Sequence, residues 1–221
     1  MSNILDIPKR IFLCLVPLLF TACAAPDKYD YSAYRQSMPR SILVLPPLNN
    51  SPDVQATYSV LSTVTKPLAE AGYYVFPVAL VDQTFKENGL FNPGEMHQAP
   101  LEKLREIFGA EAVLYITVTS YGASYQLFNS QILVTAQARL VDARNGQLLW
   151  QGMASASDDE GNRNSGGLVA MLVTAVIKQI VSNVVGDQQS HHIARITSTR
   201  LLTPRPNGLL YGPRSPLYKQ K

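Results

Sequence analysis

Cysteine is scarce in this chain, and its placement limits what the chain can do. Of the 221 residues only Cys14 and Cys23 are cysteines, so no thiol occurs after residue 23. A disulfide, a cysteine nucleophile and a cysteine-ligated metal each need a thiol, so all three are excluded from the long remainder of the chain. The folded part of the protein must therefore be held together by packing alone.

Histidine is almost as rare, with three residues in the chain. They show no His-x-x-x-His spacing, which two zinc ligands on one helix face would require. His97 is the one candidate general base, but it lies in a loop flanked by proline and glycine and is interpreted as a solvated loop residue. His191 and His192 are adjacent, so they cannot both face one site on a regular helix or strand.

The usual motifs of enzymes are missing as well. Gly161–Gly167 precedes an apolar segment as a phosphate loop would, but the lysine that such a loop needs after its last glycine is absent. Asp158–Glu160 is an acidic run without the glycine and the distant glutamate of a calcium loop. No Gly-x-Ser-x-Gly nucleophile motif occurs. We therefore predict that the protein is not an enzyme, with no catalytic residue, no metal and no cofactor.

Charge of either sign is modest. The chain holds 19 Lys and Arg against 16 Asp and Glu, a net charge of +3. Lys9, Arg10 and Asp6 precede Cys23 and account for one net positive charge, which leaves +2 for the rest. A nucleic-acid-binding domain usually carries a strongly basic face. We expect no nucleic-acid partner.

The N-terminal residues have the order of a secretory signal peptide. Lys9 and Arg10 precede the apolar run Ile11–Phe20, and the small residues Thr21 and Ala22 follow it. As a helix the run would span about 15 Å, too short to cross a hydrocarbon core of about 30 Å. We therefore predict that residues 1–22 are a signal peptide.

A cysteine directly after the small residues resembles the signal of bacterial lipoproteins. In that signal the cysteine is diacylated and becomes the new N-terminus, so the resemblance implies lipid attachment, including palmitate, at Cys23. In such lipoproteins an aspartate at the next position favours the inner membrane; Ala24 stands there instead, which implies the outer membrane. Several acyl chains at about 0.8 kcal/mol per methylene would hold the protein firmly on a membrane. The residues alone leave an ordinary signal peptide with a chance cysteine as the alternative.

Composition divides the rest of the chain into three parts. Residues 23–40 carry several tyrosines and no apolar period, and are predicted to be a tether; docking of the tyrosines on the domain or on a partner is the alternative. Residues 41–187 carry the apolar periodicity and are predicted to be the folded domain. Residues 188–221 are predicted to be a basic segment rich in proline and glycine, in which Leu209–Tyr211 is a patch that docks on the body or on a partner.

Apolar periodicity within residues 41–187 switches between the periods of strands and helices. Apolar or alternating runs predict strands at 41–45, 73–77, 112–119, 132–140 and 147–153. Three-to-four spacing predicts helices at 54–71, 78–87 and 99–109, and Pro67 predicts a kink or an early break in the first of them. Asp142–Gly146 predicts a hairpin turn, in which Asn145-Gly146 supplies positive φ. A loop is predicted at 92–94, and a turn or a ragged extension at 121–129. The fold class is therefore α/β: a mixed sheet with an antiparallel meander and helices packed against it.

Gly167–Val185 is predicted to be one long apolar helix with a single charged residue. Its length makes a transmembrane helix the alternative. Thr174, Lys178 and Ser182 form a polar stripe at four-residue spacing, which suits a helix packed on a sheet better. The remaining face is wider than one sheet needs, which indicates a subunit interface. A short helix or extended piece is predicted at His191–Leu201.

Three segments carry a resemblance to a known family. They are Ile42–Pro47, Phe108–Leu114 and Leu140–Trp150, and their order is that of domains similar to the N-terminal domain of TolB, shared by CsgG-type and penicillin-binding-protein activator lipoproteins. With the predicted signal, the chain most closely resembles the bacterial lipoprotein family of the genome-derived neisserial surface antigens. The resemblance implies a TolB N-terminal-domain-like α/β fold, no known enzymatic activity, a homodimer, and a CsgG-like lipoprotein as partner.

The leading hypothesis is therefore an outer-membrane-anchored lipoprotein that serves as a non-enzymatic interaction or assembly module in the cell envelope, accessory to a CsgG-like secretion or transport system. The alternatives are a small-ligand-binding lipoprotein auxiliary to an envelope transporter, an activator of a peptidoglycan synthase, and an envelope hydrolase with His97 as its base. Cys23 is the only residue for which the sequence predicts a chemical role.

Overall fold

The computed structural model describes residues 29–126, 129–158 and 182–218, and the structural statements below concern these residues. The helices are α2 (Ser32–Ser37), α3 (Ala56–Thr63), α4 (Thr65–Glu70), α5 (Val78–Glu87), α6 (Pro93–Met96), α7 (Leu101–Phe108) and α9 (Ser182–Leu202). The strands are β1 (Ser41–Val44), β2 (Leu48–Asn49), β3 (Tyr74–Val75), β4 (Ala112–Ser120), β5 (Ala123–Gln126), β6 (Asn129–Asp142) and β7 (Leu148–Ser157).

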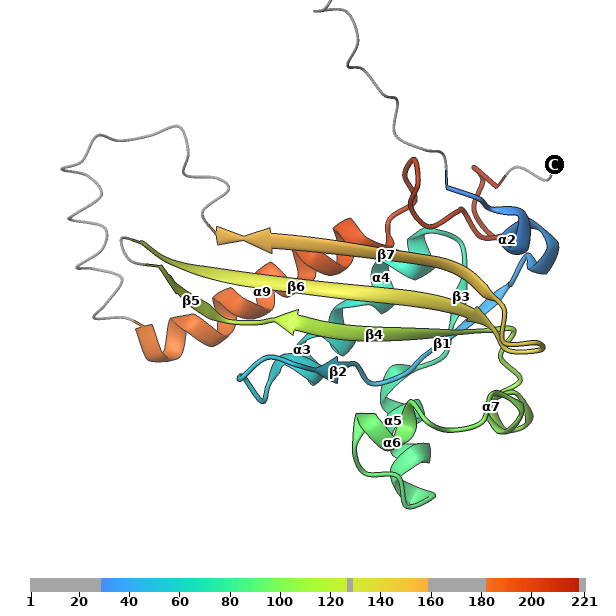
Figure 1. Cartoon of the computed structure of the whole chain (residues 1–221), viewed down its shortest axis with the longest axis horizontal. Helices are drawn as coiled ribbons and strands as arrows, with labels where there is room; N and C mark the ends of the chain where they lie inside the picture. The colour runs from blue at the N-terminus through green and yellow to red at the C-terminus, as the bar shows by residue number, and fades with distance from the viewer. Residues whose placement is uncertain (1–28, 127–128, 159–181, 219–221) are drawn as a thin grey trace, which may run out of the picture.

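The strands form one seven-stranded mixed sheet (Figure 1). Its order is β3-β1-β4-β6-β5, with β2 paired to β4 and β7 paired to β6. β1 pairs in parallel with β3 and β4, whereas β4, β5 and β7 each pair antiparallel with β6. The α/β fold with a mixed sheet and an antiparallel meander, predicted from the sequence, is confirmed.

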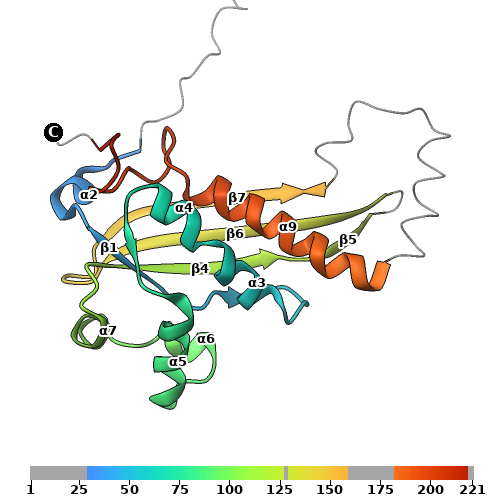
Figure 2. The same ribbon diagram turned by 180° about the vertical axis from the view of Figure 1, so that it is seen from behind.

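One face of the sheet is covered by α3, α4 and α9 (Figure 2). Alternate residues of the central strands point toward these helices, as the period of two requires. They form the larger core together with apolar residues of the three helices, among them Ile42, Leu114, Val134 and Trp150 from the strands and Val60, Leu68, Ala194 and Leu201 from the helices. Trp150 is 1% exposed, which confirms that it fills the core.

The opposite face is covered only in part. Leu43, Leu45 and Val113 point to this side and pack with Val81 and Leu104 in a second, smaller core, which α5, α6 and α7 supply. This layer lies over β1 and the start of β4 (Figure 1). No described helix covers β6, β7 and the second half of β4 on this side, so a broad part of the sheet is open.

A proline shapes two of the helices. As Pro67 predicts, the helix expected at 54–71 is interrupted, and it breaks at Val64 into α3 and α4. Pro67 has no N–H to donate to the carbonyl of Thr63. The helical hydrogen bonds are therefore interrupted at Thr63, about one turn before the proline. At 92–94, where the sequence predicts a loop, Pro93 begins the one-turn helix α6, because the Asn92 side chain accepts a hydrogen bond from the Glu95 N–H at 2.9 Å.

The antiparallel strands extend further than predicted. The sequence predicts a turn or ragged extension at Tyr121–Asn129, but β5 and the start of β6 form a ladder there. β6 begins three residues before the apolar alternation starts at Ile132. A ladder is made by backbone groups, so it can continue where the side chains no longer alternate.

Helix α9 crosses the predicted boundary between the domain and the C-terminal segment at residue 187. Ile193 and Leu201 are buried on the sheet, and the Thr197 hydroxyl donates to the Val134 carbonyl at 3.1 Å, so this helix belongs to the folded body. A helix over His191–Leu201 is confirmed. Residues 167–181 of the predicted apolar helix lie outside the described residues. Of the helices that the structure describes, none has the length and apolar character that crossing a membrane requires.

Candidate functional site

Cys23 lies outside the described residues, so its acylation stays a prediction. His97 can be followed: its Nε2 lies 2.9 Å from the Pro46 carbonyl, and its ring packs edge-on against Tyr115. Burial lowers the pKa of His97, and the hydrogen bond to Pro46 offsets part of that shift. The ring is therefore held between backbone and tyrosine, rather than exposed on a loop as the sequence predicted.

The other two histidines point in different directions, as their adjacency predicts. His191 Nδ1 lies 3.1 Å from the Ser59 hydroxyl, which also accepts a hydrogen bond from Tyr121 at 2.7 Å. His192 Nδ1 lies 2.9 Å from the Arg195 guanidinium. Ser59 is partly buried and His191 is exposed, and their contact joins α3 to α9 near the protein surface. In the described part of the chain, no three acidic or histidine side chains gather as a metal site requires.

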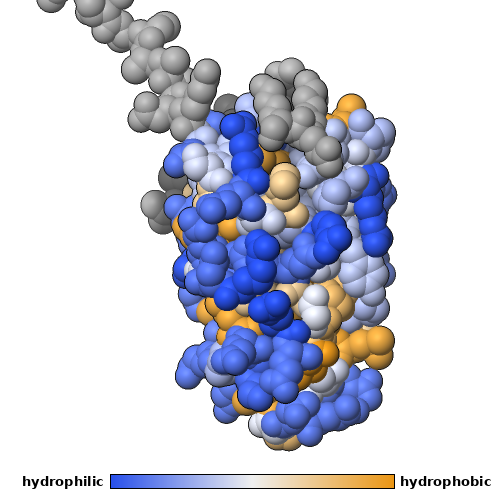
Figure 3. Space-filling model, turned by 90° about the vertical axis from the view of Figure 1, so that its right-hand side faces the viewer, coloured by the Kyte–Doolittle hydropathy of each residue, from blue (hydrophilic) through white to orange (hydrophobic). Residues whose placement is uncertain are grey.

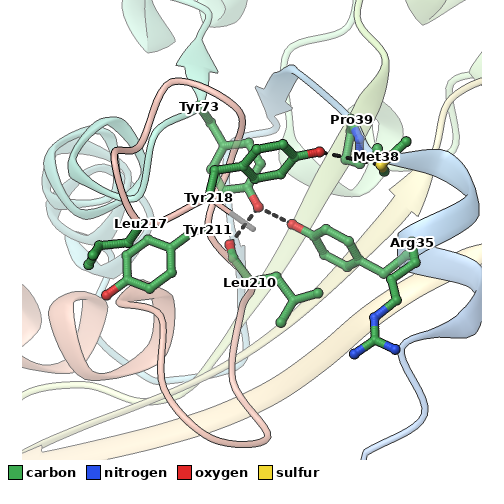
Figure 4. Close-up of a pocket in the computed structure, with 9 residues that line it drawn as sticks. Arg35, Met38, Pro39, Tyr73, Leu210, Tyr211, Leu217 and Tyr218 are labelled. Carbon is green, nitrogen blue, oxygen red and sulfur yellow. Dashed lines mark hydrogen bonds between the residues drawn. The ribbon is translucent and has the colours of Figure 1, made fainter. Parts of the chain in front are cut away.

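A pocket of about 480 Å³ opens where the first and last described segments meet (Figure 4). Its volume lies in the range of small-ligand pockets. We call it the tyrosine pocket, because four of its nine lining residues are tyrosines. The lining consists of Tyr34, Arg35, Met38, Pro39, Tyr73, Leu210, Tyr211, Leu217 and Tyr218.

Helix α2 forms one wall of the tyrosine pocket. Tyr31 is the N-cap of this helix, and just before it Asp30 accepts hydrogen bonds from the backbone N–H and the hydroxyl of Ser32, at 2.9 and 2.6 Å. These bonds lower the pKa of Asp30, the hydroxyl bond contributing most. Met38 ends the helix in the left-handed conformation, with its N–H donating to the Tyr34 carbonyl at 2.8 Å. Tyr34, in the middle of this six-residue helix, points inward and is 4% exposed.

The buried hydroxyls of the pocket form a chain. The Tyr73 hydroxyl donates to the Leu210 carbonyl at 2.6 Å, so it accepts the hydrogen bond from Tyr34 (Figure 4). Burial is the largest cause that raises the pKa of both tyrosines above the ordinary value. Both phenols therefore stay neutral at physiological pH, and their hydroxyls stabilise the pocket walls instead of acting as acids or bases.

Two glycines fix the C-terminal wall. Gly72 has a φ of +98°, and a Cβ built on it would lie 2.4 Å from the Ser215 nitrogen. Gly212 N–H donates to the Ala71 carbonyl at 2.8 Å, and Arg214 N–H donates to the Gly72 carbonyl at 3.1 Å. The C-terminal segment is thus held by its backbone against the turn between α4 and β3, and only glycine leaves room for this approach.

The two terminal segments also contact each other. Tyr31 donates to the Gly208 carbonyl at 2.5 Å, and the Tyr29 N–H donates to the Asn207 side chain at 3.1 Å. Leu209 is 1% exposed and belongs to the larger core. Residues 29–38 and 204–218 therefore dock on the body. This is the possibility that the sequence left open for the tyrosines and for the Leu209–Tyr211 patch.

A buried carboxylate ties α2 to the hairpin between β6 and β7. Asp142 is 1% exposed and accepts hydrogen bonds from the Ser37 hydroxyl at 2.5 Å and from the Arg144 guanidinium at 2.6 Å. Burial opposes its ionisation, but the hydrogen bonds from Arg144 and Ser37 outweigh it and lower the pKa of Asp142 to about 2. The turn residue predicted from the sequence thus also holds the wall of the tyrosine pocket in place.

Acid should therefore weaken the fold through Asp142. Because its folded pKa is lowered, its contribution to the free energy of unfolding is complete above its unfolded pKa near 3.8 and is lost as the pH falls toward 2. We expect a loss of about 2 kcal/mol over this window, measured by urea unfolding, and we expect Asp142→Asn to lack this component. The exposed Glu102→Gln serves as control; a parent and an Asp142→Asn protein with parallel acid profiles would contradict the assignment.

The open part of the sheet is the second candidate surface. Gln137 and Arg139 of β6 and Gln151 and Met153 of β7 point to the uncovered side and are exposed, Met153 by 60%. Figure 1 looks onto this face, with α9 behind the sheet. Of these four exposed side chains, three are polar and Met153 is apolar.

The sequence did not predict the tyrosine pocket as a site. The signals that could have found it are the tyrosines at 29, 31 and 34, for which docking is the alternative to a tether, and the Leu209–Tyr211 patch, which is predicted to dock on the body or on a partner. Which segments meet could not be read from these patterns, because Tyr73 of the wall lies far from both in the chain.

Comparisons with known proteins agree with the fold. The family model described as "Putative lipoprotein GNA1162-like" matches residues 29–214. The "Putative lipoprotein NMB1124/NMB1162" of Neisseria meningitidis serogroup B is 50% identical over 211 residues, which cover 93% of this chain and 96% of that protein. The crystal structure of lipoprotein GNA1162 from Neisseria meningitidis is 54% identical, with a TM-score of 0.52, and covers 66% of this chain and 100% of that chain.

A weaker similarity links the chain to a PelC dodecamer from Paraburkholderia phytofirmans. It is 15% identical, with a TM-score of 0.46, and covers 76% of this chain and 89% of that chain. The resemblance to the neisserial family that the sequence carries is confirmed by the family model and the two neisserial proteins.

Proposed function

Because the chain belongs to the GNA1162-like lipoprotein family, we propose that it is an outer-membrane lipoprotein, cleaved after residue 22 and acylated at Cys23, whose domain binds another envelope protein. In this proposal the domain is a non-enzymatic assembly module. The signal occupies residues 1–22, and Ala24 after the acylated cysteine directs the protein to the outer membrane.

The observation that carries this proposal is the open face of the sheet. Helices α3, α4 and α9 pack on the other face (Figure 2), whereas on this one α5 to α7 pack only against β1 and the start of β4. Gln137, Arg139, Gln151 and Met153 supply hydrogen-bonding groups and one apolar contact on rigid strands. Polar contacts around an apolar centre are typical of non-obligate protein interfaces.

The contacts of the described side chains favour binding over catalysis. His97, the candidate base, is occupied by the Pro46 carbonyl and by Tyr115. In the tyrosine pocket, Tyr34 donates its hydroxyl proton to Tyr73, Tyr73 donates its own to the Leu210 carbonyl, and both phenols remain neutral. Neither of these two arrangements places a nucleophile beside a base that could activate it.

Photocrosslinking in intact cells tests the proposal. A photoreactive amino acid at Gln137 or Met153 should capture one envelope protein in high yield, whereas the same amino acid at the exposed Glu102 of α7 should not. The captured partner decides the finer role: a CsgG-like lipoprotein, a second copy of this chain in a homodimer, or a peptidoglycan synthase. Equal yields of the same products from Gln137, Met153 and Glu102 would count against the open face as the binding surface.

A further inference from the structure

The tyrosine pocket is kept close to the proposed lipid anchor. Only five residues separate Cys23 from Tyr29, so even a fully extended chain spans about 20 Å between them. Tyr29 is itself fixed to the body through Asn207, and its ring centroid lies 4.8 Å from that of Tyr31, which contacts Tyr34. The pocket end of the domain therefore cannot move far from the surface of the membrane that holds the anchor.

This end of the domain carries exposed arginines. Arg35 lines the pocket, Arg214 lies in its C-terminal wall segment with its guanidinium 5.4 Å from the Tyr74 ring, and Arg205 lies in the loop that contacts Tyr31. Among the described residues none of the three arginines forms a salt bridge; Asp30 is the acidic residue that interacts electrostatically with Arg35. These cations are available to a ligand of opposite charge.

Two further arginines at this end of the domain are each neutralised by a carboxylate. Arg40 pairs with Glu111 at 2.6 Å, and Arg144 pairs with Asp142 at 2.6 Å. Neither pair adds net charge, so the excess positive charge near the pocket comes from the three exposed arginines.

Apolar side chains are exposed around the same opening. Met38 is 47% exposed and Leu217 is 59% exposed, and both line the pocket beside Tyr211 and Tyr218 (Figure 4). Figure 3, viewed from the end where α2 and the C-terminal segment lie in Figure 1, shows strongly hydrophilic residues interspersed with hydrophobic patches. Exposed apolar residues, tyrosines and arginines in one place are typical of surfaces that lie in the headgroup layer of a bilayer.

We propose that the face around the tyrosine pocket docks on anionic phospholipid of the membrane that carries the anchor. Arg35 and Arg214 contact the lipid phosphates, while Met38 and Leu217 enter the boundary between headgroups and acyl chains. The docked domain would then present its open sheet face at a fixed orientation. The inference rests on the proposed acylation of Cys23, because the short reach to the membrane depends on it.

Vesicle binding tests this proposal without the anchor. The protein is the chain from residue 23 onward with Cys23→Ser; the 54% identical relative crystallised as a chain that matches only 66% of this one, so the domain folds without the full length. Its partition onto phosphatidylcholine vesicles that contain roughly 30 mol% phosphatidylglycerol should greatly exceed that onto phosphatidylcholine alone, and should fall as salt screens the charges. Equal binding to both vesicles, or binding to neither, would overturn the proposal.

Charge-matched variants locate the contact. Arg35→Gln with Arg214→Gln should lower the partition onto the anionic vesicles by about 25-fold, because each arginine near an anionic surface contributes a factor of about five. Arg195→Gln, in the middle of α9, removes the same charge from an exposed site that does not line the pocket and should bind like the parent. Leu217→Ser should weaken binding to both kinds of vesicle. All four positions are exposed, so unchanged circular dichroism is expected.

The outcomes separate this inference from the proposed function. If the double variant binds like the parent, or if soluble glycerol phosphate displaces the protein completely, docking on the bilayer is wrong and any anion site is for a small ligand. If the mass of the mature protein shows no acyl chains while vesicle binding follows the arginines, docking holds and the anchor proposal fails.

Discussion

Replacing Cys23 by serine is expected to remove every acyl chain from the protein and to remove the protein from the outer membrane. Acyl transfer to this position needs the thiolate sulfur, which is a far stronger nucleophile than a serine hydroxyl. Each methylene withdrawn from the bilayer costs about 0.8 kcal/mol, so the loss of two or more chains exceeds what any surface contact of the domain could replace. Palmitate labelling and density-gradient separation of the membranes measure both effects.

Cys14→Ser is the matched control for this experiment. Cys14 is the other cysteine of the chain and lies inside the predicted signal, so its removal should leave palmitate labelling and outer-membrane location as in the parent. A Cys23→Ser protein that still carries palmitate would show that the cysteine is not the attachment site. Loss of both properties in Cys14→Ser would show that the assay reports on export rather than on acylation.

Gly72→Ala is expected to lower the free energy of unfolding by about 3 kcal/mol. An alanine there must adopt a φ of +98°, which costs roughly 1–2 kcal/mol. Its Cβ would also lie 2.4 Å from the Ser215 nitrogen and 2.8 Å from the Gly212 carbonyl oxygen, so the C-terminal segment has to move away. The hydrogen bonds from Gly212 to Ala71 and from Arg214 to Gly72 are then lost, at about 0.5–1.5 kcal/mol each. Urea unfolding measures the sum.

Gly89→Ala separates the two contributions. Gly89 has a similar φ of +82°, but a Cβ there would meet nothing within 4 Å, so alanine should cost only the backbone strain. The difference between the two variants reports the contact between the C-terminal segment and the body. If Gly72→Ala costs no more than Gly89→Ala, the segment does not depend on this contact for its position.

Local sequence patterns were sufficient to predict most of the individual helices and strands. The helix predicted at 78–87 coincides with α5, because its apolar spacing, the preceding Pro77 and the following Asn88-Gly89 leave little choice of ends. The hairpin at Asn145-Gly146 follows from the same kind of local rule, with Gly146 at a φ of +74°. At Val64, the hydrogen bond that Pro67 cannot donate to the Thr63 carbonyl determined where the first predicted helix breaks.

The functional surfaces depended on contacts between distant residues. The tyrosine pocket joins residues 34–39, Tyr73 and residues 210–218, and its buried hydroxyl chain runs through all three segments. Each segment by itself is a short polar or aromatic stretch with no periodicity. The open sheet face also depends on distant residues. It is the part of the sheet that α5 to α7 do not reach and that no other described helix covers.

The sequence by itself determined the scarcity of thiols and histidines, the predicted signal with Cys23, and the α/β class, since composition and periodicity are properties of neighbouring residues. The tertiary structure decided that residues 29–38 dock on the body, that α9 continues past residue 187, and that Gly72 and Gly212 let the C-terminal segment pack against the turn between α4 and β3. These depend on which surfaces bury one another, and burial is settled only when the whole chain has packed.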